Sequence, residues 1–79
     1  MYTLVKFLSM NQAVLQKNGK TYVASFSDVY TEPEVLVFKS NPDGEILDWS
    51  EVDGGRGYTS LQQFLSTVLH NPNYRSYTS

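Results

Sequence analysis

The sequence contains no cysteine, only one histidine and only one tryptophan among its 79 residues. Without cysteine, neither a disulfide nor a thiolate-bound metal centre can form. The absence of cysteine also fits a reducing compartment. We therefore expect no covalent stabilisation of the fold.

No stretch of the sequence is apolar enough to cross a membrane. The longest stretch without Asp, Glu, Lys or Arg covers residues 57–74, and it is rich in Ser, Thr, Gln and Asn. Lys6 interrupts the first ten residues, and no small-residue cleavage site follows them, so no secretory signal is predicted. We expect a cytoplasmic protein with no membrane partner.

Charge of either sign is scarce, since eight acidic and six basic residues give a net charge of −2. That charge is too small to bind a phosphate backbone by bulk attraction. Hydrophobic residues make up 41% of the chain and aromatic residues 14%, which is the balance of an ordinary globular domain. The length predicts a single domain over residues 1–79.

The dipeptide Asn18-Gly19 predicts a tight β-hairpin between residues 13–17 and residues 20–26. Both turn residues tolerate the positive φ that a two-residue type I′ turn requires. This turn fixes which residues face one another across the hairpin: Lys17 and Lys20, Leu15 and Tyr22, Val14 and Val23, and Ala13 and Ala24. The face that carries Leu15 and Tyr22 is expected to be the core face.

A second hairpin is predicted around residues 41–44, Asn-Pro-Asp-Gly, after the apolar run at residues 35–38. Proline suits the second position of a type I turn, and Gly44 suits the left-handed position of the bulge that follows. Gly44, like Gly19, is therefore expected to have a positive φ. This register places Val37 opposite Trp49 and Lys39 opposite Leu47, whereas a four-residue loop would shift the pairing by one residue.

Residues 2–8 have the alternation of a strand, with apolar side chains on both sides, which suits a central place in a sheet. The glycine-rich residues 53–57 are expected to form a flexible connector.

Ser60 and Gln63 predict a capping box at the start of a helix. The helix carries one apolar stripe, made of Leu61, Phe64, Leu65, Val68 and Leu69. The sequence thus predicts an α+β fold: a small antiparallel β-sheet of about five strands with two hairpins, and one C-terminal helix packed on one face.

No catalytic motif is present, so an enzyme is not expected. His70 falls in the last turn of the predicted helix, where its charged form would complement the helix dipole, and no acid for a nucleophilic site lies nearby. Asp48, Glu51 and Asp53 lack the spacing of a calcium loop. In a strand, the first two point to opposite faces. We therefore predict no catalytic residue, no metal site and no cofactor.

The string Gly54-Gly55-Arg56-Gly57 admits two interpretations. Backbone amides of a glycine-rich loop ahead of a helix can hold a phosphate, and Arg56 would add charge. Neither the dinucleotide pattern nor the P-loop pattern accompanies it, and one arginine-glycine copy is not an RNA-binding tract. The favoured interpretation is a plain linker.

Aromatic residues are numerous for a core of this size, with six Tyr, four Phe and one Trp. Those in loops or in the tail either lean on the rim of the domain or form an interaction surface. Interfaces concentrate affinity in Trp, Tyr and Arg, and the candidate binding residues are Trp49, Arg56, Tyr58, Tyr74 and Tyr77. The glycine loop is expected to let Arg56 and Tyr58 reach outward. Residues 73–79 are expected to dock on the domain, with at least one of the two tail tyrosines more than half buried.

Residues 34–70 contain a series of short elements. An acidic residue, Glu34, begins an apolar strand; a turn with Gly44 follows, then residues 48–51 (Asp-Trp-Ser-Glu), then Tyr-Thr before a capped helix that ends near His70. This series resembles a class of small bacteriophage-encoded proteins of unknown function. The chain departs from that class at Val35-Leu36, where Thr-Met or Thr-Ile is usual, and in a helix with Gln and Ser in place of Glu and Ala. The resemblance implies a phage origin and action on a host protein in the host cytoplasm.

These observations favour a non-enzymatic protein-binding module, and with the resemblance a phage accessory protein that modulates a host protein. The alternative is a nucleic-acid-associated domain that uses an aromatic strand face, and strong salt dependence of nucleic-acid binding would favour it. Its basic residues would be Lys17, Lys20, Lys39 and Arg56. A homodimer built on an exposed sheet edge also stays open, because five strands leave two edges.

Overall fold

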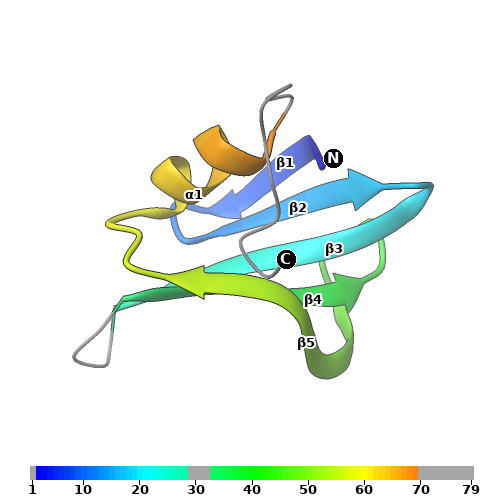
Figure 1. The fold of residues 1–79 in the computed structure, drawn as a ribbon. Helices are drawn as coiled ribbons and strands as arrows, with labels where there is room; N and C mark the ends of the chain where they lie inside the picture. The colour runs from blue at the N-terminus through cyan, green and yellow to red at the C-terminus, as the bar shows by residue number, and fades with distance from the viewer. Residues whose placement is uncertain (1, 29–32, 70–79) are drawn as a thin grey trace.

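The computed structural model describes residues 2–28 and 33–69. In this part of the chain five strands precede one helix: β1 (Thr3–Ser9), β2 (Gln12–Lys17), β3 (Lys20–Ser27), β4 (Glu34–Ser40), β5 (Ile46–Arg56) and α1 (Leu61–Val68). Each strand pairs antiparallel with its neighbours in the chain, and α1 lies across one face of the sheet (Figure 1). The predicted α+β fold is therefore confirmed.

The first hairpin has the predicted turn and the predicted register. Asn18 has a φ of 54° and Gly19 a φ of 77°, as a type I′ turn requires. Leu15 faces Tyr22, and Val14 faces Val23 on the other side of the sheet. Because side chains alternate along a strand, this register assigns Leu15 to the face under the helix.

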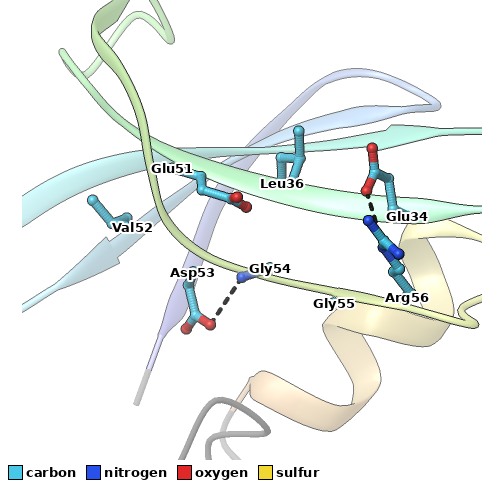
Figure 2. Close-up of a pocket in the computed structure, with 8 residues that line it drawn as sticks. All are labelled: Glu34, Leu36, Glu51, Val52, Asp53, Gly54, Gly55 and Arg56. Atoms are coloured by element: carbon cyan, nitrogen blue, oxygen red, sulfur yellow. Dashed lines mark hydrogen bonds and ion pairs between the residues drawn. The ribbon is translucent and has the colours of Figure 1, made fainter.

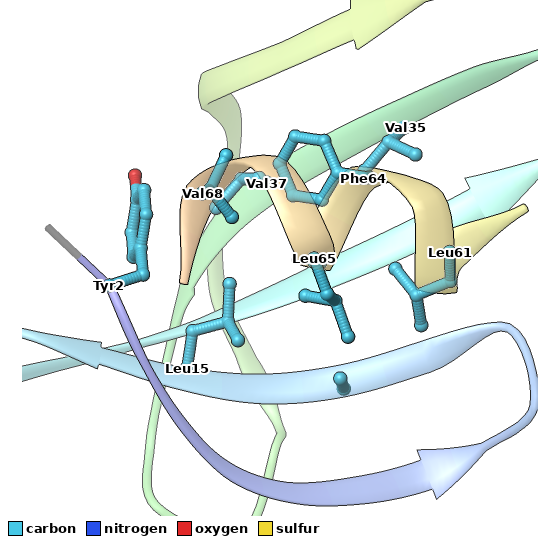
Figure 3. Packing of buried hydrophobic residues seen from close by; sticks show 10 residues of the cluster. Tyr2, Leu15, Val35, Val37, Leu61, Phe64, Leu65 and Val68 are labelled. Atoms are coloured by element: carbon cyan, nitrogen blue, oxygen red, sulfur yellow. The ribbon is translucent and has the colours of Figure 1, made fainter. Parts of the chain in front are cut away.

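The face under the helix holds the main core (Figure 3). The sheet contributes five buried residues that are 0% exposed: Ala13, Leu15, Ala24, Val35 and Val37. The helix contributes the predicted stripe, whose buried members are Leu61, Phe64, Leu65 and Val68. Burial of this stripe, rather than intrinsic propensity, stabilises so short a helix.

The helix begins at a variant of the predicted capping box. The Ser60 hydroxyl accepts a hydrogen bond from the N–H of Gln63 at 3.1 Å, as predicted. The Gln63 side chain accepts from the N–H of Thr59 at 2.6 Å. The reciprocal bond therefore reaches one residue further back than in a standard box, and two amides at the helix start still find partners.

The second turn also has the predicted form. The N–H of Gly44 donates to the carbonyl of Asn41 at 3.0 Å, and Gly44 has a φ of 91°. This tip folds over the second face of the sheet, because a Cβ on Gly44 would lie 2.5 Å from Leu8 Cδ1 and 3.2 Å from Val14 Cγ2. Val14, next to this tip, and Val23 are both buried on the face away from the helix, at 0% and 1% exposure.

The predicted register of the second hairpin is wrong beyond its first pair. Lys39 faces Asp48 instead of Leu47, and Val37 faces Asp53 instead of Trp49. The reason lies in β5, which has one extra residue at position 47 and a bulge at residues 49–52 opposite the single residue 38 of β4. Such bulges bend a strand and redirect its side chains.

Two further predictions on strand placement are wrong. Residues 53–56, expected to be a flexible connector, form the end of β5, where Gly54 pairs with Leu36. Residues 3–9 form an edge strand, because β1 pairs with β2 alone among the described strands. The apolar side chains on both sides of β1 are therefore not all covered, and Val5 and Phe7 are 48% and 43% exposed.

Candidate functional site

Strand β5 contains a continuous exposed stretch, which we call the exposed β5 segment (Leu47–Val52). Three of its side chains are large and apolar: Leu47, Trp49 and Val52 are 64%, 74% and 44% exposed. The backbone is fixed at both ends of the bulge, because Asp48 pairs with Lys39 and Asp53 pairs with Val37. Large apolar side chains in a fixed position on a sheet edge are typical of an interaction surface.

The Trp49 ring is exposed but held in place. Its centroid lies 5.4 Å from that of Phe38, with the two rings tilted by 59°. Phe38 is only 7% exposed and anchors the contact. A pre-positioned ring loses little conformational entropy when a partner binds, so this predicted binding residue stands where it can contact another molecule.

The bulge is stabilised by a side-chain hydrogen bond of Asp48. Its Oδ1 accepts from the N–H of Ser50 at 2.9 Å. This bond from the Ser50 backbone, with further hydrogen bonding from the Ser50 side chain and the positive charge of Lys39, holds the pKa of Asp48 below its ordinary value of 3.8. Asp48 is therefore ionised at neutral pH.

A hollow of about 390 Å³ lies next to this segment, lined in part by Gly54 and Gly55 (Figure 2). A Cβ on Gly54 would lie 2.5 Å from the carbonyl oxygen of Val35 and 3.4 Å from Glu51 Oε2. Glycine is therefore required where β5 approaches β4 so closely. We call this space the glycine-lined hollow.

Figure 2 shows Leu36 between the carboxylates of Glu51 and Glu34 on the wall of this hollow. The Arg56 Nε lies 3.6 Å from Glu34 Oε2 across the strand pair. Leu36 and Phe38 are two residues apart on β4, so they point to the same face of the sheet. The hollow and Trp49 thus adjoin on the face that α1 leaves uncovered.

The other predicted site residues are placed differently. The Arg56 side chain is exposed, as expected. The expectation for Tyr58 is wrong, because it is half-buried and its ring meets Phe64 edge-on at 5.3 Å and 87°. Tyr58 thereby belongs to the rim of the main core. Tyr74 and Tyr77 lie outside the described residues, as do His70 and the expected docking of residues 73–79.

The basic residues of the nucleic-acid alternative divide between two places. Lys20 and Lys39 line a second hollow of about 520 Å³ near the first turn, and Lys17 Nζ lies 5.1 Å from the ring centroid of Tyr2. Arg56 pairs with Glu34 at the other end of β4. The described part of the chain therefore has no continuous basic stripe.

Residues 2–28 and 33–69 contain no group of three His, Asp or Glu placed to hold a metal ion. The same residues include no helix long and apolar enough to span a membrane. Comparison of the chain with protein-family models, with curated proteins and with solved structures gives no match.

Sequence reasoning missed Leu36, Glu51 and the hollow between them. The sequence did indicate a strand that continues toward the glycine pair, because apolar and polar residues alternate at residues 47–50. The alternation of Leu47, Asp48, Trp49 and Ser50 is typical of a strand. Residues 54–57 were instead interpreted as a linker because three of the four are glycine.

Proposed function

We propose that this chain is a non-enzymatic protein-binding module whose contact surface is the exposed β5 segment together with the glycine-lined hollow. The observation that carries the proposal is Trp49, which is 74% exposed while its ring packs on Phe38. Tryptophan is among the residues that concentrate affinity at interfaces. Covering a large apolar side chain is worth about 1.5–3 kcal/mol, so a partner that covers Trp49 gains substantially.

A protein partner fits this surface better than a nucleic acid. Asp48 and Glu51 lie on either side of Trp49 in the exposed β5 segment, and carboxylates repel a phosphate backbone. Lys17 and Lys20 face each other at the first turn, and Lys39 lies opposite the Asp48 carboxylate, which partly balances its charge. We therefore place nucleic-acid binding second.

A narrower proposal is a phage accessory protein that modulates a host protein by contact in the host cytoplasm. Its support is the resemblance of residues 34–70 to small phage-encoded proteins. That stretch includes the Asp-Trp-Ser-Glu string of the exposed β5 segment and both strands that line the hollow. The resembling residues thus include Trp49 and Glu51 of the proposed contact, whereas Leu36 belongs to the pair at which the chain departs from that class.

The test is capture from a host lysate with two matched variants of the full chain. Trp49→Ala removes the proposed contact, whereas Met10→Ala removes another exposed apolar side chain, 85% exposed, in the turn between β1 and β2. We expect a discrete protein to be retained by the parent and by Met10→Ala and to be lost with Trp49→Ala. Equal retention by all three proteins would contradict the proposed surface, and salt-sensitive capture of nucleic acid alone would favour the second candidate.

A further inference from the structure

The acidic residues of this chain are concentrated around the proposed contact surface. Five of the eight lie between Lys39 and Arg56, and no Lys or Arg lies among them. The rest of the chain has three acidic and six basic residues. Lys39 lies opposite Asp48 and partly balances its charge, whereas Glu51 and Asp53 have no basic residue opposite them on β4. The stretch around Glu51 is therefore negative although the net charge of the chain is only −2, and it attracts cationic groups.

We propose that the partner presents an extended segment of alternating apolar and basic residues, and that one Lys or Arg side chain of this segment enters the glycine-lined hollow. This inference rests on the proposed function and adds the chemistry of the partner. The apolar residues would cover Trp49 and Val52, and the basic residue would pair with Glu51. Charge complementarity of this kind sets partner choice and association rate.

The hollow has the dimensions and the chemistry for such a side chain. Its volume of about 390 Å³ lies at the lower end of the roughly 300–1,000 Å³ typical of small-ligand sites, which leaves room for one long side chain. Lys and Arg lay their aliphatic stems on apolar surface and keep the charged head near polar groups. Leu36 offers the apolar wall, and the Glu51 carboxylate lies beside it (Figure 2).

The two acids beside Leu36 have different roles. Glu34 has Arg56 at 3.6 Å, and its side chain is 21% exposed, so its charge is already compensated within the chain. Glu51 is exposed and lines the hollow from the bulge of β5. Glu51 is therefore the group assigned to the incoming cation. Trp49 lies two residues before it, and its face attracts a second cation of the segment.

The exposed position of Trp49 provides the readout. It is the only tryptophan of the chain, so its fluorescence reports directly on whether the proposed surface is covered. The probes are three synthetic extended peptides that alternate valine with arginine, glutamine or glutamate. We expect the arginine peptide to shift Trp49 emission to shorter wavelength and to bind about tenfold more tightly than the glutamine peptide, with an affinity that falls as salt is added. The glutamate peptide should not bind.

Two matched variants locate the charge effect. Glu51→Gln should weaken binding of the arginine peptide about three- to tenfold. Glu45→Gln makes the same change at an exposed acid that does not line the hollow, and it should change the affinity less than about twofold. Circular dichroism of both variants checks that the fold is retained.

Three results would overturn the inference. Equal binding of the arginine and glutamine peptides would remove the preference for cations, yet the proposed function would stand, because apolar contact with Trp49 would account for binding. No emission shift with any peptide would also overturn it, and the capture experiment with Trp49→Ala would then judge the proposed function separately. Self-association that Glu51→Gln abolishes would identify a second copy, not a basic segment, as the occupant.

Discussion

Replacing Gly54 with alanine tests the close approach of β5 to β4 that shapes the hollow. The Cβ would lie 2.5 Å from the carbonyl oxygen of Val35, whereas ordinary contact begins at 3.4 Å. The two atoms would have to separate by about 0.9 Å, which is the difference between these distances. Because the oxygen belongs to the backbone of a paired strand, no side-chain rotation relieves the overlap.

The expected destabilisation has two sources. Overpacking costs about 1–3 kcal/mol, and a non-glycine residue at this strongly positive φ costs a similar amount. Gly54 has a φ of 155°. One shift of the backbone would relieve part of the overlap and part of the φ strain. We therefore expect the free energy of unfolding to fall by about 3 kcal/mol. That is a large part of the total stability of a small domain, which starts near 5 kcal/mol.

Gly57→Ala is the matched control. Gly57 has a φ of 86°, and nothing lies within 4 Å of its ideal Cβ, so alanine there costs only the conformational penalty of about 1–2 kcal/mol. Urea denaturation followed by far-UV circular dichroism compares the two variants; Trp49 fluorescence is a poor probe, because that ring is exposed in the folded state as well. A Gly54→Ala variant no less stable than Gly57→Ala would refute the close approach and the shape of the hollow.

Three further predictions concern stability. Phe64→Ala should destabilise the domain by about 3–5 kcal/mol in urea melts, because a ring that is 0% exposed leaves a cavity in the main core; a loss below about 1 kcal/mol would contradict its packing. Trp49→Ala should lower the free energy of unfolding by only about 0.5–1.5 kcal/mol, mainly through loss of the ring contact with Phe38. A larger decrease would show that Trp49 belongs to the core. The lowered pKa of Asp48 stabilises the fold at pH values above its ordinary value of 3.8, and this contribution disappears as the pH falls through the lower folded-state pKa. NMR titration should find that lower pKa, and Asp48→Asn should flatten this part of the acid-unfolding profile.

Local patterns in the sequence predicted those parts of the fold that depend on residues close in the chain. Asn18-Gly19 fixed the first hairpin and its register, since a two-residue turn leaves no freedom in the pairing. The stripe around Phe64 predicted the buried side of α1 for the same reason, as helical spacing is a local property.

The rest depended on contacts between distant residues. The bulge at residues 49–52 has no marker in the sequence, and it moved Trp49 away from its expected partner Val37. Gly54 looked like part of a linker because glycine is frequent in loops, whereas here it allows two strands to approach. Trp49 could be predicted as a binding residue because tryptophan is frequent at interfaces. That Glu51 and Leu36 line the same hollow could not be predicted, because it depends on how β5 pairs with β4.

The central claim is that the exposed β5 segment is where a partner binds, and site-directed photocrosslinking tests it most directly. The chain has no cysteine, so Ser50→Cys introduces a unique thiol for a crosslinker within that segment. Gln62→Cys places the same group on the exposed side of α1. After irradiation in the lysate used for the capture experiment, the account predicts one discrete protein adduct from position 50 and none from position 62. An adduct from position 62 alone, or the same adduct from both positions, would contradict it.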